Sequence, residues 1–133
     1  MTVHTRHTDR GSETVETAVL AGLAVVLLLS VVQAGLWWHT RNLCLHAAAT
    51  GLQASRALHA TPDAGERAAA EFLHRAPNAA SDPATIVSAS ATEVSVRVSA
   101  TAPRVLPIPG LDFRVHETAS AAQERFTTPG ETR

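Results

Sequence analysis

The stretch TAVLAGLAVVLLLSVVQAGLWW, residues Thr17–Trp38, decides the architecture of this 133-residue chain. It has no charged side chain over the roughly 20 residues that a helix needs to cross a bilayer. Trp37 and Trp38 close the stretch and Arg41 follows, which is typical of a helix entering the headgroup region. The pattern predicts one transmembrane helix whose outer membrane interface lies at these three residues.

The residues around this stretch predict its orientation. Arg6 and Arg10 lie in a short leader, which the positive-inside rule places in the cytoplasm, so the rest of the chain is expected on the far side. A cleaved secretory signal is the main competing interpretation. It is disfavoured because the apolar stretch is longer than a signal core and ends in Leu36-Trp37-Trp38-His39, which has no small-x-small cleavage pattern.

The composition limits the chemistry expected of the far-side domain. A formal net charge of −1, with two Trp, three Phe and no Tyr, disfavours nucleic-acid binding. The histidines show no metal-ligand spacing beside a carboxylate, and the sequence has no phosphate-binding glycine loop or nucleophile elbow. We therefore expect a non-enzymatic protein without a metal, a cofactor or a small-molecule substrate.

Cys44 is the single cysteine of the chain, which excludes an intramolecular disulfide. We expect its side chain to be a small buried hydrophobe, with an intermolecular thiol as the alternative. A small domain without a disulfide buries a limited core, so packing against neighbouring subunits is expected to contribute to its stability.

After the membrane stretch the sequence predicts two helices. The Ala-rich, proline-free segment Arg41–His59 continues the membrane helix out of the bilayer. Leu45, Ala49 and Leu52 recur in it at helical spacing and are expected to form a packing stripe against either the domain or a neighbouring subunit. A break before Pro62 separates it from a second helix of about Pro62 to Arg75.

The remainder predicts a small antiparallel sheet of about three strands, which makes the fold class α+β. A breaker-rich loop from Pro77 to Pro83 comes first. Alternation of apolar and polar residues then predicts strands at Ile86–Ala91, Glu93–Ala100 and Leu111–His116. The side chains expected to be buried on one sheet face are Val94, Val96, Val98, Phe113 and Val115.

The motif Asp9-Arg10-Gly11-Ser12-Glu13-Thr14-Val15-Glu16 lies directly before the apolar stretch. It resembles a class III, or prepilin-type, signal, in which a membrane peptidase cuts after the glycine and leaves the apolar helix on the mature chain. A carboxylate at the mouth of a membrane helix is costly unless it is neutralised. The new α-amine of Ser12 could pair with Glu16 of a neighbouring subunit. The alternative is that Gly11 is a linker residue and Glu16 a snorkelling interfacial charge.

The whole chain from about residue 9 to 126 resembles the TadE-like proteins, minor pilins or pseudopilins of tight-adherence (Flp-type) pilus systems. The resemblance lies in the leader, the apolar helix ending in Gly35-Leu36-Trp37, the Ala-rich helix after Arg41, and Glu124-Arg125-Phe126. It implies a structural role in pilus assembly. It also implies a prepilin peptidase, other pilins and the inner-membrane assembly platform as partners, besides the lipid bilayer.

These interpretations divide the chain into four segments: a cytoplasmic leader (1–11), a transmembrane helix (12–38), an extracytoplasmic α+β pilin-like domain (39–126) and a disordered tail (127–133). The predicted site residues are Gly11 and Ser12 for processing, Glu16 for assembly, and Trp37, Trp38 and Arg41 for the membrane interface. The expected location is the cell membrane, with incorporation into a surface pilus as an extension. The alternative function is a single-pass envelope binding module whose signal anchor is never cleaved.

Overall fold

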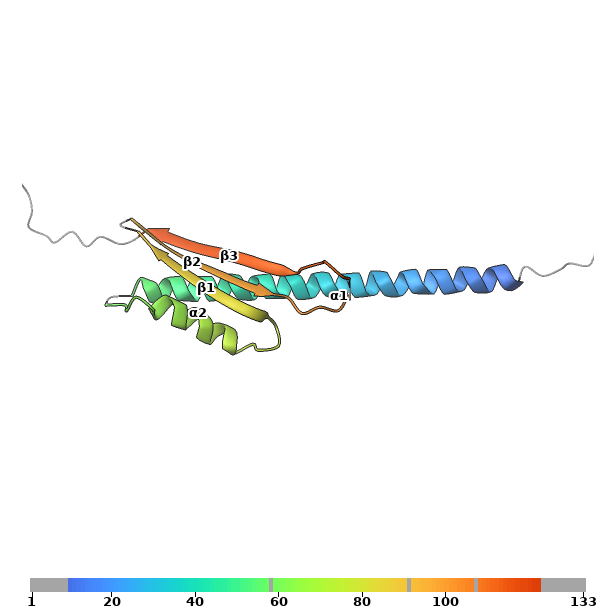
Figure 1. The fold of residues 1–133 in the computed structure, drawn as a ribbon, viewed down its shortest axis with the longest axis horizontal. Coiled ribbons are helices and arrows are strands. Elements are labelled where there is room, and N and C mark those ends of the chain that lie inside the picture. The colour runs from blue at the N-terminus through green and yellow to red at the C-terminus, as the bar shows by residue number, and fades with distance from the viewer. Residues whose placement is uncertain (1–9, 58, 91, 107, 123–133) are drawn as a thin grey trace, which may run out of the picture.

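The computed structural model describes residues 10–57, 59–90, 92–106 and 108–122 (Figure 1). Its elements, in chain order, are α1 (Arg10–Ser55), α2 (Ala64–His74), β1 (Ser81–Ala89), β2 (Glu93–Thr101) and β3 (Arg114–Ala122). A long apolar helix and a shorter second helix thus precede a three-stranded antiparallel sheet. This order confirms the predicted α+β class.

Helix α1 runs without a break from the leader through the apolar stretch into the domain. Its 46 residues contain no proline, and at about 1.5 Å per residue they span about 69 Å. Figure 1 shows its N-terminal half projecting away from the rest, while α2 and the sheet lie along its C-terminal half. An 18-residue window of α1 has a mean hydropathy of 2.5 and no buried residue. Such a helix near the N-terminus suggests membrane anchoring.

The sheet has the strand order β1-β2-β3, so β2 is paired on both sides. Val96 of β2 lies opposite Val87 of β1 and Ala119 of β3. The predicted alternation on β2 is confirmed, because Val94, Val96 and Val98 are buried. One face of the central strand therefore supplies the aliphatic contacts with α1.

The predicted bounds of the third strand are wrong, because β3 covers Arg114–Ala122 and not Leu111–His116. The amide of Ala102 donates to the carbonyl of Phe113, and Leu111–Phe113 belong to the loop before β3. The strand continues where small residues alternate, with Ala119 partly buried between exposed neighbours. Alanine on a core face gives a weak hydrophobic signal. The larger apolar side chains before it therefore led to a predicted strand that begins and ends too early in the sequence.

The first strand also differs from its prediction, since Asp82 and Pro83 lie inside β1 and not in a loop. The pairing with β2 shifts between Ser81 and Ala84, and Asp82 has a φ of 48°. A bulge on an edge strand is one of the few places where a sheet accepts proline, which has no amide hydrogen for the ladder.

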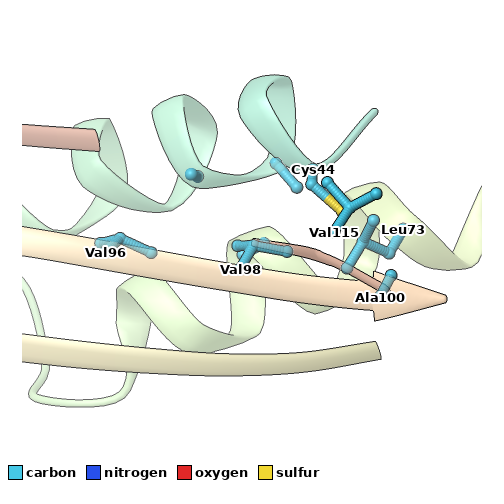
Figure 2. Close-up of a cluster of buried hydrophobic side chains, with 9 residues drawn as sticks. Cys44, Leu73, Val96, Val98, Ala100 and Val115 are labelled. Atoms are coloured by element: carbon cyan, nitrogen blue, oxygen red, sulfur yellow. The ribbon is translucent and has the colours of Figure 1, made fainter. Parts of the chain in front are cut away.

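The core lies between the C-terminal half of α1, helix α2 and the sheet, as the close-up in Figure 2 shows. Its buried residues are Cys44, Ala47, Ala48, Ala69, Leu73, Val96, Val98, Ala100 and Val115. Of the predicted packing stripe on α1, Leu52 packs against this core, whereas Leu45 is exposed and Cys44, Ala47 and Ala48 are fully buried. Phe113 is only partly buried. Small side chains supply the fully buried part of the contact face of α1 and let β2 and α2 approach closely, while Leu43 and Leu52 pack partly buried beside them.

Helices α1 and α2 approach most closely at Gly51 and Gly65. A Cβ atom on Gly51 would lie 2.8 Å from the carbonyl oxygen of Gly65 and 3.2 Å from Cγ1 of Val96. A Cβ atom on Gly65 would overlap the hydroxyl of Ser55, which donates to the carbonyl of Gly51 at 2.9 Å. Both glycines are therefore needed for the helices to pack at this separation.

The thiol of Cys44 points into this core, as predicted for a buried hydrophobe. Burial raises the pKa of the Cys44 thiol to about 11, and the negative charge of Glu117 adds to the effect. Both causes disfavour the thiolate, which is the reactive form of cysteine. The folded domain thus keeps its single thiol inert at neutral pH.

We expect Gly51→Ala to lower the free energy of unfolding of the domain by about 1–3 kcal/mol, because the added methyl group displaces the backbone of α2. Gly35→Ala is the matched control, since a Cβ atom there meets nothing within 4 Å. Hydrogen-exchange protection of the β2 amides in detergent micelles measures the difference. Equal protection in the two variants would contradict the close packing of α1 and α2.

We also expect Cys44 to be alkylated by a maleimide at pH 8 at least about a hundredfold more slowly in the folded protein than after denaturation, because a pKa of about 11 replaces the ordinary 9.0. The folded pKa is raised, so its stabilising effect is present below pH 9 and is lost as the pH rises towards 11. Rapid labelling of the native protein at pH 8 would show that the thiol is accessible.

Candidate membrane and assembly site

Gln33 is a buried polar residue within the predicted transmembrane stretch, only 3% exposed. Its Nε2 donates to the carbonyl of Pro103 at 3.0 Å. Its Oε1 accepts from the backbone amides of Val105 at 2.8 Å and Leu106 at 3.3 Å. The loop between β2 and β3, described at residues 102–106 and 108–113, is thereby hydrogen-bonded to α1 beyond the end of the sheet (Figure 1).

Two further side chains attach the domain to α1 just above Gln33. The buried hydroxyl of Thr40 lies 2.8 Å from the carbonyl oxygen of Ala79, in the connection between α2 and β1. Nε of Arg41 donates to Oε1 of Glu117 on β3 at 2.6 Å. Because the side chain of Arg41 is 43% exposed, this ion pair contributes at most about 1 kcal/mol. Its value lies in fixing the position of β3 beside the helix.

The three residues predicted at the membrane interface lie together on α1. Trp37 and Trp38 are exposed, and the guanidinium carbon of Arg41 lies 5.5 Å from the ring centroid of Trp38. Arg41 therefore contacts the ring of Trp38 and also pairs with Glu117 of β3. No local sequence pattern indicates this second partner, which is distant along the chain.

The predicted processing and assembly residues lie at the other end of the apolar segment. Gly11 and Ser12 fall in the first turn of α1, and Glu16 is exposed just after it. Trp37 comes 21 residues after Glu16, a separation of about 32 Å along a helix. The structure thus does not bring Glu16 near Trp37, and the distance matches the roughly 30 Å hydrocarbon thickness of a bilayer.

An apolar groove lies where the loop meets α1, with a volume of about 430 Å³. It is lined by Ser30, Gln33, Ala34, Trp37, Leu106, Leu111 and Phe113. Sequence reasoning missed this groove and the role of Gln33. The available signals were the lone amide side chain in an apolar stretch and the apolar, proline-rich composition of residues 103–111. In the described part of the chain, no group of three or more His, Cys, Asp or Glu side chains is placed to hold a metal ion.

Comparison with protein families gives one finding, and it concerns α1. The model of the family described as TadE-like protein matches residues 11–53. No curated protein and no solved structure matches the chain. The matched range begins at Gly11, contains the apolar stretch and the Gln33, Thr40 and Arg41 contacts, and ends within the buried face of α1. Over residues 11–53 this chain therefore matches the TadE-like family, as its leader and apolar helix predicted.

Proposed function

We propose that this protein is a TadE-like minor pilin or pseudopilin that takes part in assembling a tight-adherence (Flp-type) pilus or a related secretion machinery. The observation that carries this proposal is α1, which matches the TadE-like family and joins an exposed apolar half to a half that holds an α+β domain. The role is structural. The chain would act by inserting in a membrane and contacting other subunits.

The proposed assembly contact involves Glu16 and the amino terminus created by processing. Glu16 is exposed on α1 and lies at the start of an apolar surface that includes Val19 and Leu20. An unpaired carboxylate near the bilayer is costly, so a cationic partner stabilises it. The α-amine of Ser12 on a neighbouring subunit would serve, and the pairing would set the stagger between adjacent helices.

The proposed processing step is cleavage of the Gly11–Ser12 bond by a prepilin peptidase on the cytoplasmic side. This bond lies at the very beginning of α1, where helix ends fray most readily. Opening the first turn would give the peptidase an extended backbone, and the absence of a side chain on Gly11 would allow close approach. The proposed topology places residues 1–11 in the cytoplasm and the domain outside it.

The two leader roles are tested together with Gly11→Trp and Glu16→Leu. Gly11→Trp is expected to leave full-length precursor in the membrane because the indole blocks the approach of the peptidase. Glu16→Leu is expected to be processed normally but to lose crosslinking to other pilins, since the new amine of Ser12 lacks its partner. Immunoblots for precursor and mature forms, with crosslinking in cells, measure both effects.

Glu13→Leu is the matched control, because Glu13 is another exposed carboxylate in the first turn of α1 but is not the residue assigned to assembly. It should be processed and crosslinked like the wild type. If Gly11→Trp is still shortened, or if Glu16→Leu crosslinks as Glu13→Leu does, the alternative of an uncleaved membrane-anchored binding module becomes the better account.

The proposed topology is tested with a reporter enzyme fused after Phe126. We expect activity from a reporter that works only outside the cytoplasm, because Arg6 and Arg10 hold the leader inside. A fusion after Arg10 to a reporter that works only in the cytoplasm should also be active. Activity of the cytoplasmic reporter at the Phe126 position would reverse the proposed orientation.

A further inference from the structure

We propose that the β2–β3 loop is a second membrane contact of this protein, resting in the boundary between headgroups and acyl chains beside α1, with lipid chains filling the groove. We call its residues 104–106 and 108–111 the lip. The proposal rests on the membrane anchoring of α1 but not on a role in pilus assembly. In this proposal, the domain is held at the bilayer surface both by α1 and by the lip.

The lip exposes several apolar side chains. Val105, Ile108 and Leu111 are 37%, 45% and 42% exposed, and Leu111 lines the groove together with the exposed Trp37 of α1. A contiguous apolar surface of this kind is unusual where a protein meets water, and it marks a contact with a partner or a membrane. Here it is continuous with the exposed apolar half of α1.

The position of the lip along the axis of α1 corresponds to the depth of the membrane interface. The lip is bonded to Gln33, four residues before Trp37, which places it about 6 Å nearer the middle of the membrane than the indole of Trp37. The groove extends to Ser30, about one further turn down the helix. Elements that lie in the membrane interface insert by about 5–10 Å. The lip is thus at interfacial depth whenever Trp37 and Trp38 lie among the headgroups.

Several backbone amides of the lip have hydrogen-bond acceptors within the protein. Irregular backbone is tolerated at membrane depth only where its donors have acceptors within the protein. Gln33 accepts from Val105 and Leu106, while the amides of Ile108 and Leu111 donate to carbonyls within the loop. Pro103, immediately before the lip, and Pro109, within it, have no amide hydrogen to satisfy. This arrangement removes much of the cost of bringing the loop into a medium of low polarity.

Charge on the lip fits the same place. Arg104 is exposed, and its guanidinium donates to the carbonyl of Leu111 at 3.1 Å. A long basic side chain at the edge of a bilayer keeps its stem in the apolar layer and its head among the phosphates.

A helix of a neighbouring subunit is the other occupant that the groove could take. Lipid is favoured because the groove opens beside a helix surface that meets lipid before any assembly takes place.

The test uses the full chain in vesicles of phosphatidylcholine and phosphatidylglycerol, with a fluorophore attached at Ile108→Cys. A nitroxide near the start of the lipid acyl chains should quench this fluorophore at least about twofold more than one at Ser120→Cys, an exposed position on β3. Buried Cys44 does not compete for the label. Equal lipid quenching at the two positions, with equal quenching by aqueous iodide, would overturn the proposal.

A third probe at Val26→Cys, exposed in the apolar half of α1, tests the membrane anchoring of α1 separately from the membrane contact of the lip. Lipid quenching at Val26 without quenching at Ile108 would reject the lip and leave the membrane anchor intact. Absence of quenching at both positions would reject the anchor as well. The protein is also diluted in lipid, which separates its copies. If the protection of the Ile108 probe from iodide is lost on dilution, another copy occupies the groove and the proposal is overturned.

The contribution of Gln33 is measured with Gln33→Leu in the Ile108→Cys protein. Leucine keeps the helix apolar but leaves the amides of Val105 and Leu106 without their acceptor, so lipid quenching at Ile108 should fall towards that at Ser120. Gln53→Leu is the control, since Gln53 is exposed on α1 away from the loop. Unchanged quenching in Gln33→Leu would overturn the assignment of Gln33 as the residue that positions the lip.

Discussion

The close packing of β2 and α2 on the small side chains of α1 is the contact on which the rest of the domain depends. Ala47 and Ala48 are fully buried, and Gly51 brings the helix against both Gly65 and Val96. The sheet is three strands wide, and the buried face of β2 packs on α1. The core of the domain therefore includes the C-terminal half of α1, and removing that half would uncover the buried face of β2.

This dependence also fixes where the domain stands relative to the apolar segment. Gln33, Thr40 and Arg41 each bind a different part of the chain, so the loop before β3, the connection before β1 and β3 itself are all attached to α1. Hydrogen bonds of this kind contribute about 1 kcal/mol each, less than the packing of the core. Their effect is on geometry, because they determine which residues of the domain lie nearest the apolar segment of α1.

The sequence was sufficient for features with a strong local period and insufficient for contacts between distant segments. The apolar stretch and the valines of β2 follow helical and strand periods, and Cys44 was correctly expected in the core. The third strand was placed too early because Ala119 is a weak apolar signal. The predicted stripe of Leu45, Ala49 and Leu52 missed the fully buried Ala47 and Ala48 because close packing selects small residues. The Gln33 and Arg41 contacts join residues more than 65 positions apart, beyond any local pattern.

The continuity of α1 has a mechanical consequence. A helix without proline or a break resists bending and twisting, so a rotation of its apolar half about the axis turns the attached sheet through nearly the same angle. An axial pull at the first turn is likewise carried by the backbone to the glycine contact with α2, with no hinge to absorb it. A movement of the first turn of α1 is thereby transmitted to β1 and β3, some 60 Å away along the helix.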